Sequence, residues 1–173
     1  MPTRHRNFET GRAKLIEILE EMSCNGVDPD YQTLYNSIRY VNNLISSTRE
    51  NTAFIDAQKT ALSLFAEFRN LGIEPTLGAF EYLMKIYNKS VGKGKCHAII
   101  FDIIGELEKK QKAGMSLKLI LPEDADFFHQ AMDNIFNLKN VKLAYRTHRL
   151  LLNEGENCNV LLGGYLYQTY YYK

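Results

Sequence analysis

The segment LFAEFRNLGIEPTLGAFEYLM, residues 64–84, decides the fold of this chain, because it contains a helix end, a break and a helix start. Leu64 and Phe68 are four residues apart, which places them on one face of a helix. Gly72 supplies the left-handed conformation with which many helices end, and Pro75 can begin the next helix. The segment therefore predicts two helices joined by a short turn.

The same order of features occurs in residues 15–38, where an aliphatic and acidic run leads to Gly26 and Pro29. Both segments have the pattern G-[VI]-[DE]-P at the break. Gly114 and Gly155 follow two further apolar runs that match less well, so that the successive glycines are 46, 42 and 41 residues apart. A period of this size is typical of arrays of paired helices.

The apolar periodicity predicts an all-α chain, a helix-turn-helix repeat solenoid in which each unit buries its apolar face on its neighbours. The predicted helices are 9–25, 31–46, 53–71, 77–90, 95–113, 123–138, 140–154 and 159–172. We expect one array, with units of about 9–30, 31–76, 77–122 and 123–158 and a partial unit at 159–173. Two of the predicted core stripes are Ala61, Leu64, Phe65, Phe68 and Leu71, and Val141, Ala144, Tyr145, His148 and Leu151.

Neither end of the chain has the polar capping repeat that natural solenoids carry. The sequence opens on the second helix of a pair, and it closes on the aromatic run 165–172, which favours burial against a further helix. We therefore expect a fragment of a longer solenoid, or a chain that relies on a partner.

Composition limits the classes of function. The net charge of +1 gives no global field that would demand nucleic acid, although residues 76–173 carry +3 and residues 1–75 carry −2. No apolar run reaches the roughly 18 residues that cross a bilayer, and neither a secretory signal nor an organellar presequence is recognisable. Cysteines 24, 96 and 158 are odd in number and far apart, which indicates a reducing compartment. Each is expected to fill a small apolar space.

The junctions at residues 15–38 and 64–84 resemble those of the pentatricopeptide repeat family, in which L-F-x-x-[MF]-x-x-x-G-[IV]-x-P precedes the next helix. The stretch 147–173 resembles, more particularly, the pentatricopeptide repeat proteins of the mitochondrial ribosomal small subunit. Its matching residues are His148, Leu150, Leu151, Gly155, Asn157, Gly163, Tyr170 and Tyr171. The resemblance implies an α-α superhelix in the mitochondrial matrix that is associated with RNA and lies in the small subunit near the path of mRNA entry.

In this family, helical repeats can read one base each through a residue in the first helix and a residue just before the next repeat. Aligned first helices place Tyr35, Glu81, His129 and Tyr167 at the first position, and Asp30 and Thr76 at the second. None of the first-position residues is a short hydrogen-bonding side chain, so a base code is not expected. The aromatic rings could stack bases without selecting them, or they could be packing residues.

Two basic features could contact an RNA backbone. The segment 89–95 reads as a basic loop with Lys93 and Lys95, and it lacks the glycine and Ser/Thr positions of a phosphate-binding loop. The other feature is a stripe at helical spacing, formed by Lys139, Lys142, Arg146 and Arg149. Either feature could equally be a solvated surface.

No catalytic residue, metal site or cofactor is predicted. Glu123, Asp124 and Asp126 follow Pro122 and are expected to stabilise a helix start. The four histidines have no spacing suited to zinc. The sequence thus predicts a non-enzymatic, RNA-associated repeat protein of the mitochondrial ribosome, with partners that are rRNA or mRNA bound without sequence preference and ribosomal or other proteins. Membranes and small-molecule substrates are not expected. The alternatives are an organellar RNA-processing or stability factor that binds one transcript, and a protein-interaction solenoid.

Overall fold

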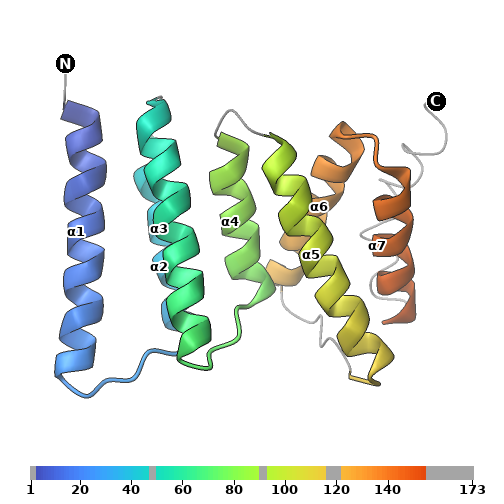
Figure 1. The fold of residues 1–173 in the computed structure, drawn as a ribbon, viewed down its shortest axis with the longest axis horizontal. Coiled ribbons are helices and arrows are strands. Elements are labelled where there is room, and N and C mark those ends of the chain that lie inside the picture. The colour runs from blue at the N-terminus through green and yellow to red at the C-terminus, as the bar shows by residue number, and fades with distance from the viewer. Residues whose placement is uncertain (1–2, 47–49, 90–92, 116–121, 155–173) are drawn as a thin grey trace. The chain divides into compact units, whose positions relative to one another are not determined.

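The computed structural model describes residues 3–46, 50–89, 93–115 and 122–154, and these ranges contain seven α-helices and no strand (Figure 1). The helices are α1 (Thr3–Cys24), α2 (Tyr31–Leu44), α3 (Asn51–Asn70), α4 (Leu77–Lys89), α5 (Lys93–Lys112), α6 (Pro122–Asn137) and α7 (Val141–Asn153). The predicted all-α helical-repeat fold is confirmed.

Seven of the eight predicted helices are present with nearly the predicted ends, and the eighth, 159–172, lies outside the described residues. The first helix is the main difference, because it begins at Thr3 rather than at residue 9. Residues 3–8 carry too few apolar side chains to show a period, yet Phe8 is buried and ties this turn to the core.

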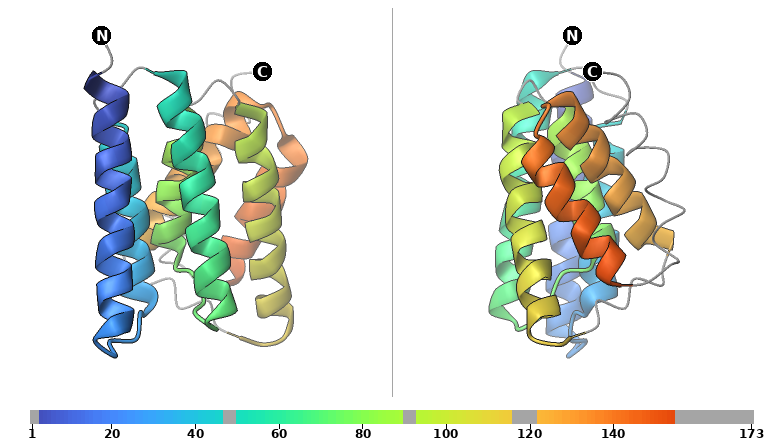
Figure 2. Two further views of the ribbon diagram at one scale, coloured as in Figure 1. Left: turned by 60° about the vertical axis from the view of Figure 1, so that its left-hand side comes forward. Right: turned by 90° about the vertical axis from the view of Figure 1, so that its right-hand side faces the viewer.

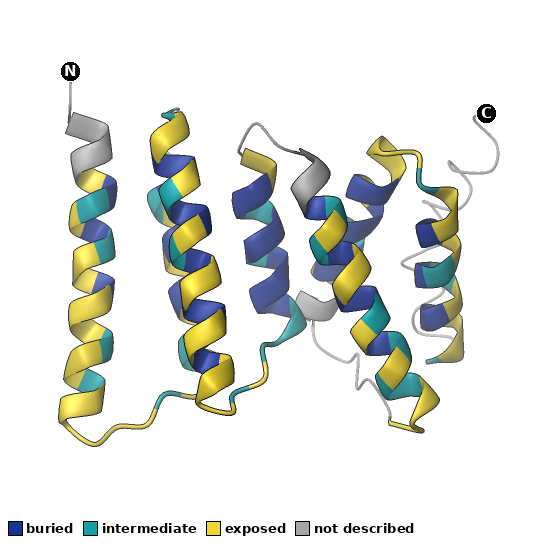
Figure 3. Cartoon of the chain, viewed as in Figure 1, coloured by how far each residue is buried: buried dark blue, intermediate teal, exposed yellow. Residues whose placement is uncertain are grey.

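The chain divides into two compact units, Met1–Gly92 and Lys93–Lys173. In the first unit α2 packs against α1, α3 and α4, and its contacts with α4 and α3 are the most extensive ones (Figures 1 and 2). Leu34, Ile38 and Val41 of α2 are completely buried. Buried residues also cover most of α4, whereas α1 is exposed over much of its length (Figure 3).

In the second unit each of α5, α6 and α7 packs against the other two. The fully buried centre of this unit is aliphatic and aromatic, and its largest members are Ile100, Ile104, Phe127, Met132 and Ile135. The boundary between the two units falls inside the predicted repeat 77–122. The predicted repeat bounds stay predictions.

The predicted glycine turns are confirmed at three positions. Gly26, Gly72 and Gly114 have φ angles of +68°, +78° and +76°. After each of them a backbone N–H reaches back to the last turn of the helix, as when Ile73 donates to the Phe68 carbonyl at 2.9 Å. A Cβ atom added at any of the three would meet nothing within 4 Å. The glycines are therefore required for their backbone conformation and not for space; Gly155 lies outside the described residues.

Lys139 adopts the same turn without being a glycine. Its φ angle is +52°, its N–H donates to the Phe136 carbonyl at 2.9 Å, and the Asn140 N–H donates to the Ile135 carbonyl at 3.1 Å. The sequence interpretation treated Lys139 as part of the stripe along the next helix. The assignment of Lys139 to the helical stripe is wrong, because Lys139 forms the turn and α7 begins only at Val141.

Two predicted core stripes need correction. Leu71 caps α3 and is 58% exposed. On α7, Ala144 and Leu151 are buried as predicted, but Val141 and Tyr145 are exposed. The other buried side chains of this helix are Leu143, Thr147 and Leu150. Two stripes of similar apolarity run along this helix, and the buried one includes Thr147, whose hydroxyl donates to the Leu143 carbonyl at 2.9 Å.

The left-handed turn at Lys139 generates a prediction about stability. A side chain in this conformation costs roughly 1 kcal/mol, and glycine removes that cost. Lys139→Gly should therefore raise the free energy of unfolding of the second unit by about 0.5–1 kcal/mol. The reciprocal control, Gly72→Lys, should lower stability by about 1 kcal/mol, since a Cβ there meets strain but no clash. Urea titrations of the three chains measure both changes, and a destabilised Lys139→Gly chain would contradict the argument.

Candidate nucleic-acid interface

The predicted first-position residues of the first unit belong to one cluster that joins α2 to α4. The Tyr35 ring meets the Tyr82 ring edge to face, with centroids 5.6 Å apart. Lys85 Nζ lies 4.8 Å from the centroid of the same Tyr82 ring and forms an ion pair with Glu81. Glu81 is only 3% exposed, so its carboxylate is neutralised locally and does not face incoming phosphate.

The sequence interpretation missed Tyr82 and Lys85. A signal for the ion pair was present, because Glu81 and Lys85 have the i, i+4 spacing at which opposite charges meet on a helix. The contact between Tyr35 and Tyr82 joins two helices, and periodicity within one helix could not reveal it.

The predicted second-position residues cap helices. The Asp30 carboxylate accepts from the Thr33 N–H at 2.8 Å, and the Thr33 hydroxyl accepts from the Asp30 N–H at 3.2 Å. The hydrogen bonds from Thr33 hold the pKa of Asp30 below its usual value. Thr76 accepts from the Ala79 N–H at 3.2 Å at the start of α4. Both side chains thus satisfy helix N-termini, which is sufficient to explain them without a base.

His129 lies half-buried on α6, in the second unit. Tyr167 lies outside the described residues.

The basic segment 89–95 is divided between helices. Lys89 ends α4, and its ammonium group donates to Asn42 Oδ1 at 3.0 Å and to Ser46 Oγ at 3.1 Å, near the C-terminus of α2. Burial lowers the pKa of Lys89, and the charge of Lys85 lowers it further. The predicted loop 89–95 extends too far, because Lys93 and Lys95 already belong to the first turn of α5.

Arg146, a member of the predicted basic stripe, is engaged inside the second unit. Its guanidinium donates to Glu108 through Nε at 3.0 Å and through Nη2 at 2.7 Å, and it lies 4.7 Å from the centroid of the Phe101 ring. The hydrogen bonds lower the pKa of Glu108 and raise that of Arg146. This two-point ion pair joins α5 to α7, so Arg146 is mainly a structural residue.

A second polar connection joins the same two helices about one turn further toward their C-terminal ends. Gln111 donates to the Leu150 carbonyl at 3.0 Å and to Glu154 Oε1 at 2.8 Å, and Asn153 donates to Gln111 Oε1 at 3.0 Å. These contacts fix the rotation of α7 about its axis and so determine which of its side chains face outward.

The outward face of α7 carries Lys142, Tyr145 and Arg149, three exposed residues at i, i+3 and i+7. Tyr145 is 56% exposed, although the sequence interpretation placed it in the core. An exposed ring between two cations can stack on a base while the cations contact phosphates. We refer to these three residues as the α7 face, and it replaces the predicted four-residue stripe.

No group of three or more His, Cys, Asp or Glu side chains in the described part of the chain could hold a metal ion. Cys96 is buried, and burial raises the pKa of its thiol to about 11, so the nucleophilic thiolate is suppressed at neutral pH. Cys24 is exposed, which corrects the expectation that it fills an apolar space, and Cys158 lies outside the described residues. Among the described helices none is long and apolar enough to span a membrane.

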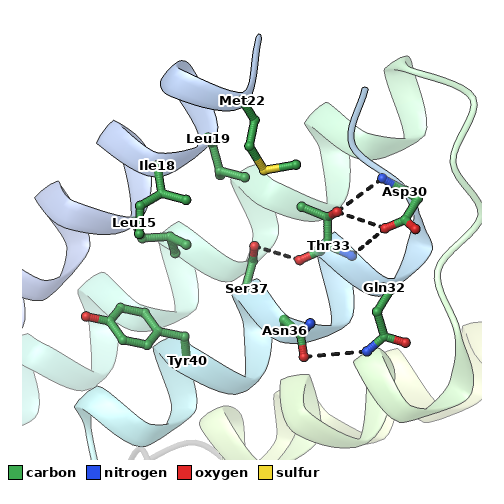
Figure 4. Close-up of a pocket in the computed structure, with 10 residues that line it drawn as sticks. All are labelled: Leu15, Ile18, Leu19, Met22, Asp30, Gln32, Thr33, Asn36, Ser37 and Tyr40. Carbon is green, nitrogen blue, oxygen red and sulfur yellow. Dashed lines mark hydrogen bonds between the residues drawn. The ribbon is translucent and has the colours of Figure 1, made fainter. Parts of the chain in front are cut away.

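A groove with a volume of about 400 Å³ lies between α1 and α2 (Figure 4). Its α1 wall is apolar and its α2 wall is mostly polar. The lining residues are Leu15, Ile18, Leu19 and Met22 of α1, Gln32, Thr33, Asn36, Ser37 and Tyr40 of α2, and Asp30 at the start of α2. The sequence interpretation did not single out this groove.

No family model matches the chain. It is 30% identical over 152 residues to small ribosomal subunit protein mS39 of Bos taurus, an alignment that covers 87% of this chain and 20% of the relative. The protein of the same name from Mus musculus is 28% identical, with 98% of this chain and 23% of the relative covered. The protein of the same name from Drosophila melanogaster is 29% identical, with 91% of this chain and 22% of the relative covered. The chain therefore spans about a fifth of the length of these relatives.

The ion pair between Glu108 and Arg146 predicts a pH dependence of stability. Because the pKa of Glu108 is lower in the folded state than in the unfolded state, its contribution is complete above the unfolded pKa and is lost as the pH falls through the folded one. At pH 7, Glu108→Gln should reduce the free energy of unfolding by about 1 kcal/mol. The difference from the parent chain should shrink as the pH is lowered from about 5 to 3. Asp133→Asn, which removes an exposed carboxylate from α6, is the matched control. A Glu108→Gln deficit that stays constant with pH would contradict the prediction.

Proposed function

We propose that this chain is a segment of a non-catalytic repeat protein of the mitochondrial ribosomal small subunit. The observation that carries the proposal is its similarity, over 87–98% of its length, to proteins named small ribosomal subunit protein mS39 in cow and mouse. The all-α repeat fold is compatible with a protein that presents surfaces rather than a reaction site. Mitochondrial localisation and association with ribosomal RNA and proteins follow from the same proposal.

The pentatricopeptide character of the repeats is part of the proposal. It is supported by the glycine turns at Gly26 and Gly72, which have the same backbone geometry and the same G-[VI]-[DE]-P sequence. It is also supported by the packing of α2 against α4, since these are the first helices of successive pairs and would line the inner surface of such an array.

Within this role, the α7 face is the surface we assign to RNA. Lys142 and Arg149 are exposed, and no ion pair among the described residues uses them. Arg149 lies close enough to Glu108 to lower the pKa of that carboxyl group, yet the hydrogen bonds of Glu108 go to Arg146. Contacts to phosphates and stacking on Tyr145 distinguish bases poorly, so the binding is indifferent to sequence.

The ribosomal role is tested by sedimentation. The tagged full-length protein, expressed in cells, should co-sediment with the small ribosomal subunit in gradients of mitochondrial lysate, and it should remain there after treatment that separates the two subunits. Sedimentation only with a messenger or a processing complex would replace the ribosomal role with that of a transcript-specific factor.

The RNA surface is tested by titrating chain 1–173 with homopolymers and mixed oligonucleotides at two salt concentrations. Lys142→Glu with Arg149→Glu should weaken all RNAs together by about tenfold or more, and it should reduce the slope of log affinity against log salt by about 1–2. Tyr145→Ala should weaken binding without creating sequence preference. The control pair Lys14→Glu with Lys59→Glu makes the same charge change on exposed residues of the first unit. Equal losses from both pairs would show that net charge alone is responsible.

A further inference from the structure

The groove between α1 and α2 corresponds to a space that is filled one repeat later. Gly26 and Gly72 align α1 with α3 and α2 with α4 at an offset of 46 residues. At this offset the α1 wall of the groove, Leu15, Ile18, Leu19 and Met22, corresponds to Ala61, Leu64, Phe65 and Phe68 of α3.

The two sets of residues differ in how far they are covered. The four α3 residues are all buried, with exposures of 0%, 6%, 6% and 2%, because α2 and α4 both pack against α3. On α1, Leu15 is 7% exposed, whereas Ile18 is 53% exposed and Leu19 and Met22 are half-buried. Ile18 is thus open to solvent where its counterpart Leu64 lies in the core.

The α2 wall shows the same difference. Gln32, Asn36 and Tyr40 line the groove and are exposed, and their counterparts on α4 are Gly78, Tyr82 and Ile86. Gly78 and Ile86 are buried, and Tyr82 packs on Tyr35 of α2. The two walls of the groove therefore correspond to the surfaces of α3 and α4 that α2 covers. Among the four helices of the first unit, none occupies the place in this groove that α2 has between α3 and α4 (Figure 4).

We propose that this groove binds one further helix of the α2 type, supplied by polypeptide that precedes residue 1 in a longer form of this protein. That helix is amphipathic and antiparallel to α1. It places apolar side chains, spaced as Leu34, Ile38 and Val41 are on α2, against Ile18 and Met22. It presents hydrogen-bonding side chains to the amides of Gln32 and Asn36, which lie 3.5 Å apart (Figure 4).

The relatives are long enough to contain such a helix. The matched region is 20–23% of the cow and mouse proteins, so most of a relative consists of further polypeptide. A repeat array continues by adding helix pairs to an open end, and the first helix to be added at this end is the partner of α1. The proposal concerns packing and does not depend on the ribosomal role.

The test supplies the missing helix. A second copy of residues 30–50, which contains α2 and its connection to α3, is joined directly before His5, the position equivalent to Asn51. Amide hydrogen exchange is measured along α1 in chain 1–173 and in the extended chain, and circular dichroism reports the added helix. Exchange in α1 should slow by about tenfold or more, because its apolar face becomes covered.

Ile18 and Ile16 form a matched pair for this experiment. They lie two residues apart on α1 and are 53% and 45% exposed, but only Ile18 lines the groove. In the extended chain, Ile18→Glu should abolish the gain in protection, and Ile16→Glu should preserve it. In chain 1–173 both variants should exchange like the parent.

Three results would overturn the proposal. One is an extended chain without added helicity or added protection of α1. Another is equal loss of protection in the two glutamate variants. The third is a concentration-dependent dimer of chain 1–173, measured by sedimentation velocity, that Ile18→Glu dissociates and Ile16→Glu does not; the groove would then belong to a second copy.

Discussion

The structure depends on one constraint, which is that a helix with a single apolar stripe cannot bury that stripe alone. In the first unit α2 covers apolar side chains of its neighbours, because it contacts α1, α3 and α4 at once. Its Leu34, Ile38 and Val41 are completely inaccessible to solvent. Three such aliphatic side chains contribute roughly 5–8 kcal/mol of burial energy, so the other three helices owe much of their arrangement to this one.

The same constraint explains how charged groups are used. Where helices meet at the edge of the core, charges pair across or along the contact, as Arg146 does with Glu108 and as Lys85 does with Glu81. Lys89 likewise reaches Asn42 and Ser46 on α2. Several residues that could have served an RNA surface therefore stabilise helix contacts, whereas Lys142 and Arg149 of the α7 face stay exposed.

Helices and turns could be predicted from the sequence because their signals are local. The stripe around Phe68 and the break at Gly72 lie within a single segment, and apart from the exposed Leu71 both were placed correctly. The site could be predicted only in part. Glu108 and Arg146 are 38 residues apart, and no period within either helix indicates that they pair. On α7 the stripe with Tyr145 and the stripe with Leu150 are about equally apolar, and only the position of α5 and α6 selects the second.

The turn at Lys139 has a consequence for how such proteins diverge. Gly26, Gly72 and Gly114 leave empty space around the place where a Cβ would stand, and Lys139 adopts the same backbone conformation with a full side chain. The repeat is therefore encoded in a dihedral angle, and the amino acid that produces the angle can change at a modest energetic cost. As sequences diverge, the residues that mark each repeat can be substituted one at a time while the helices keep their positions. A chain of this kind can match no family model and still stack its helices in register.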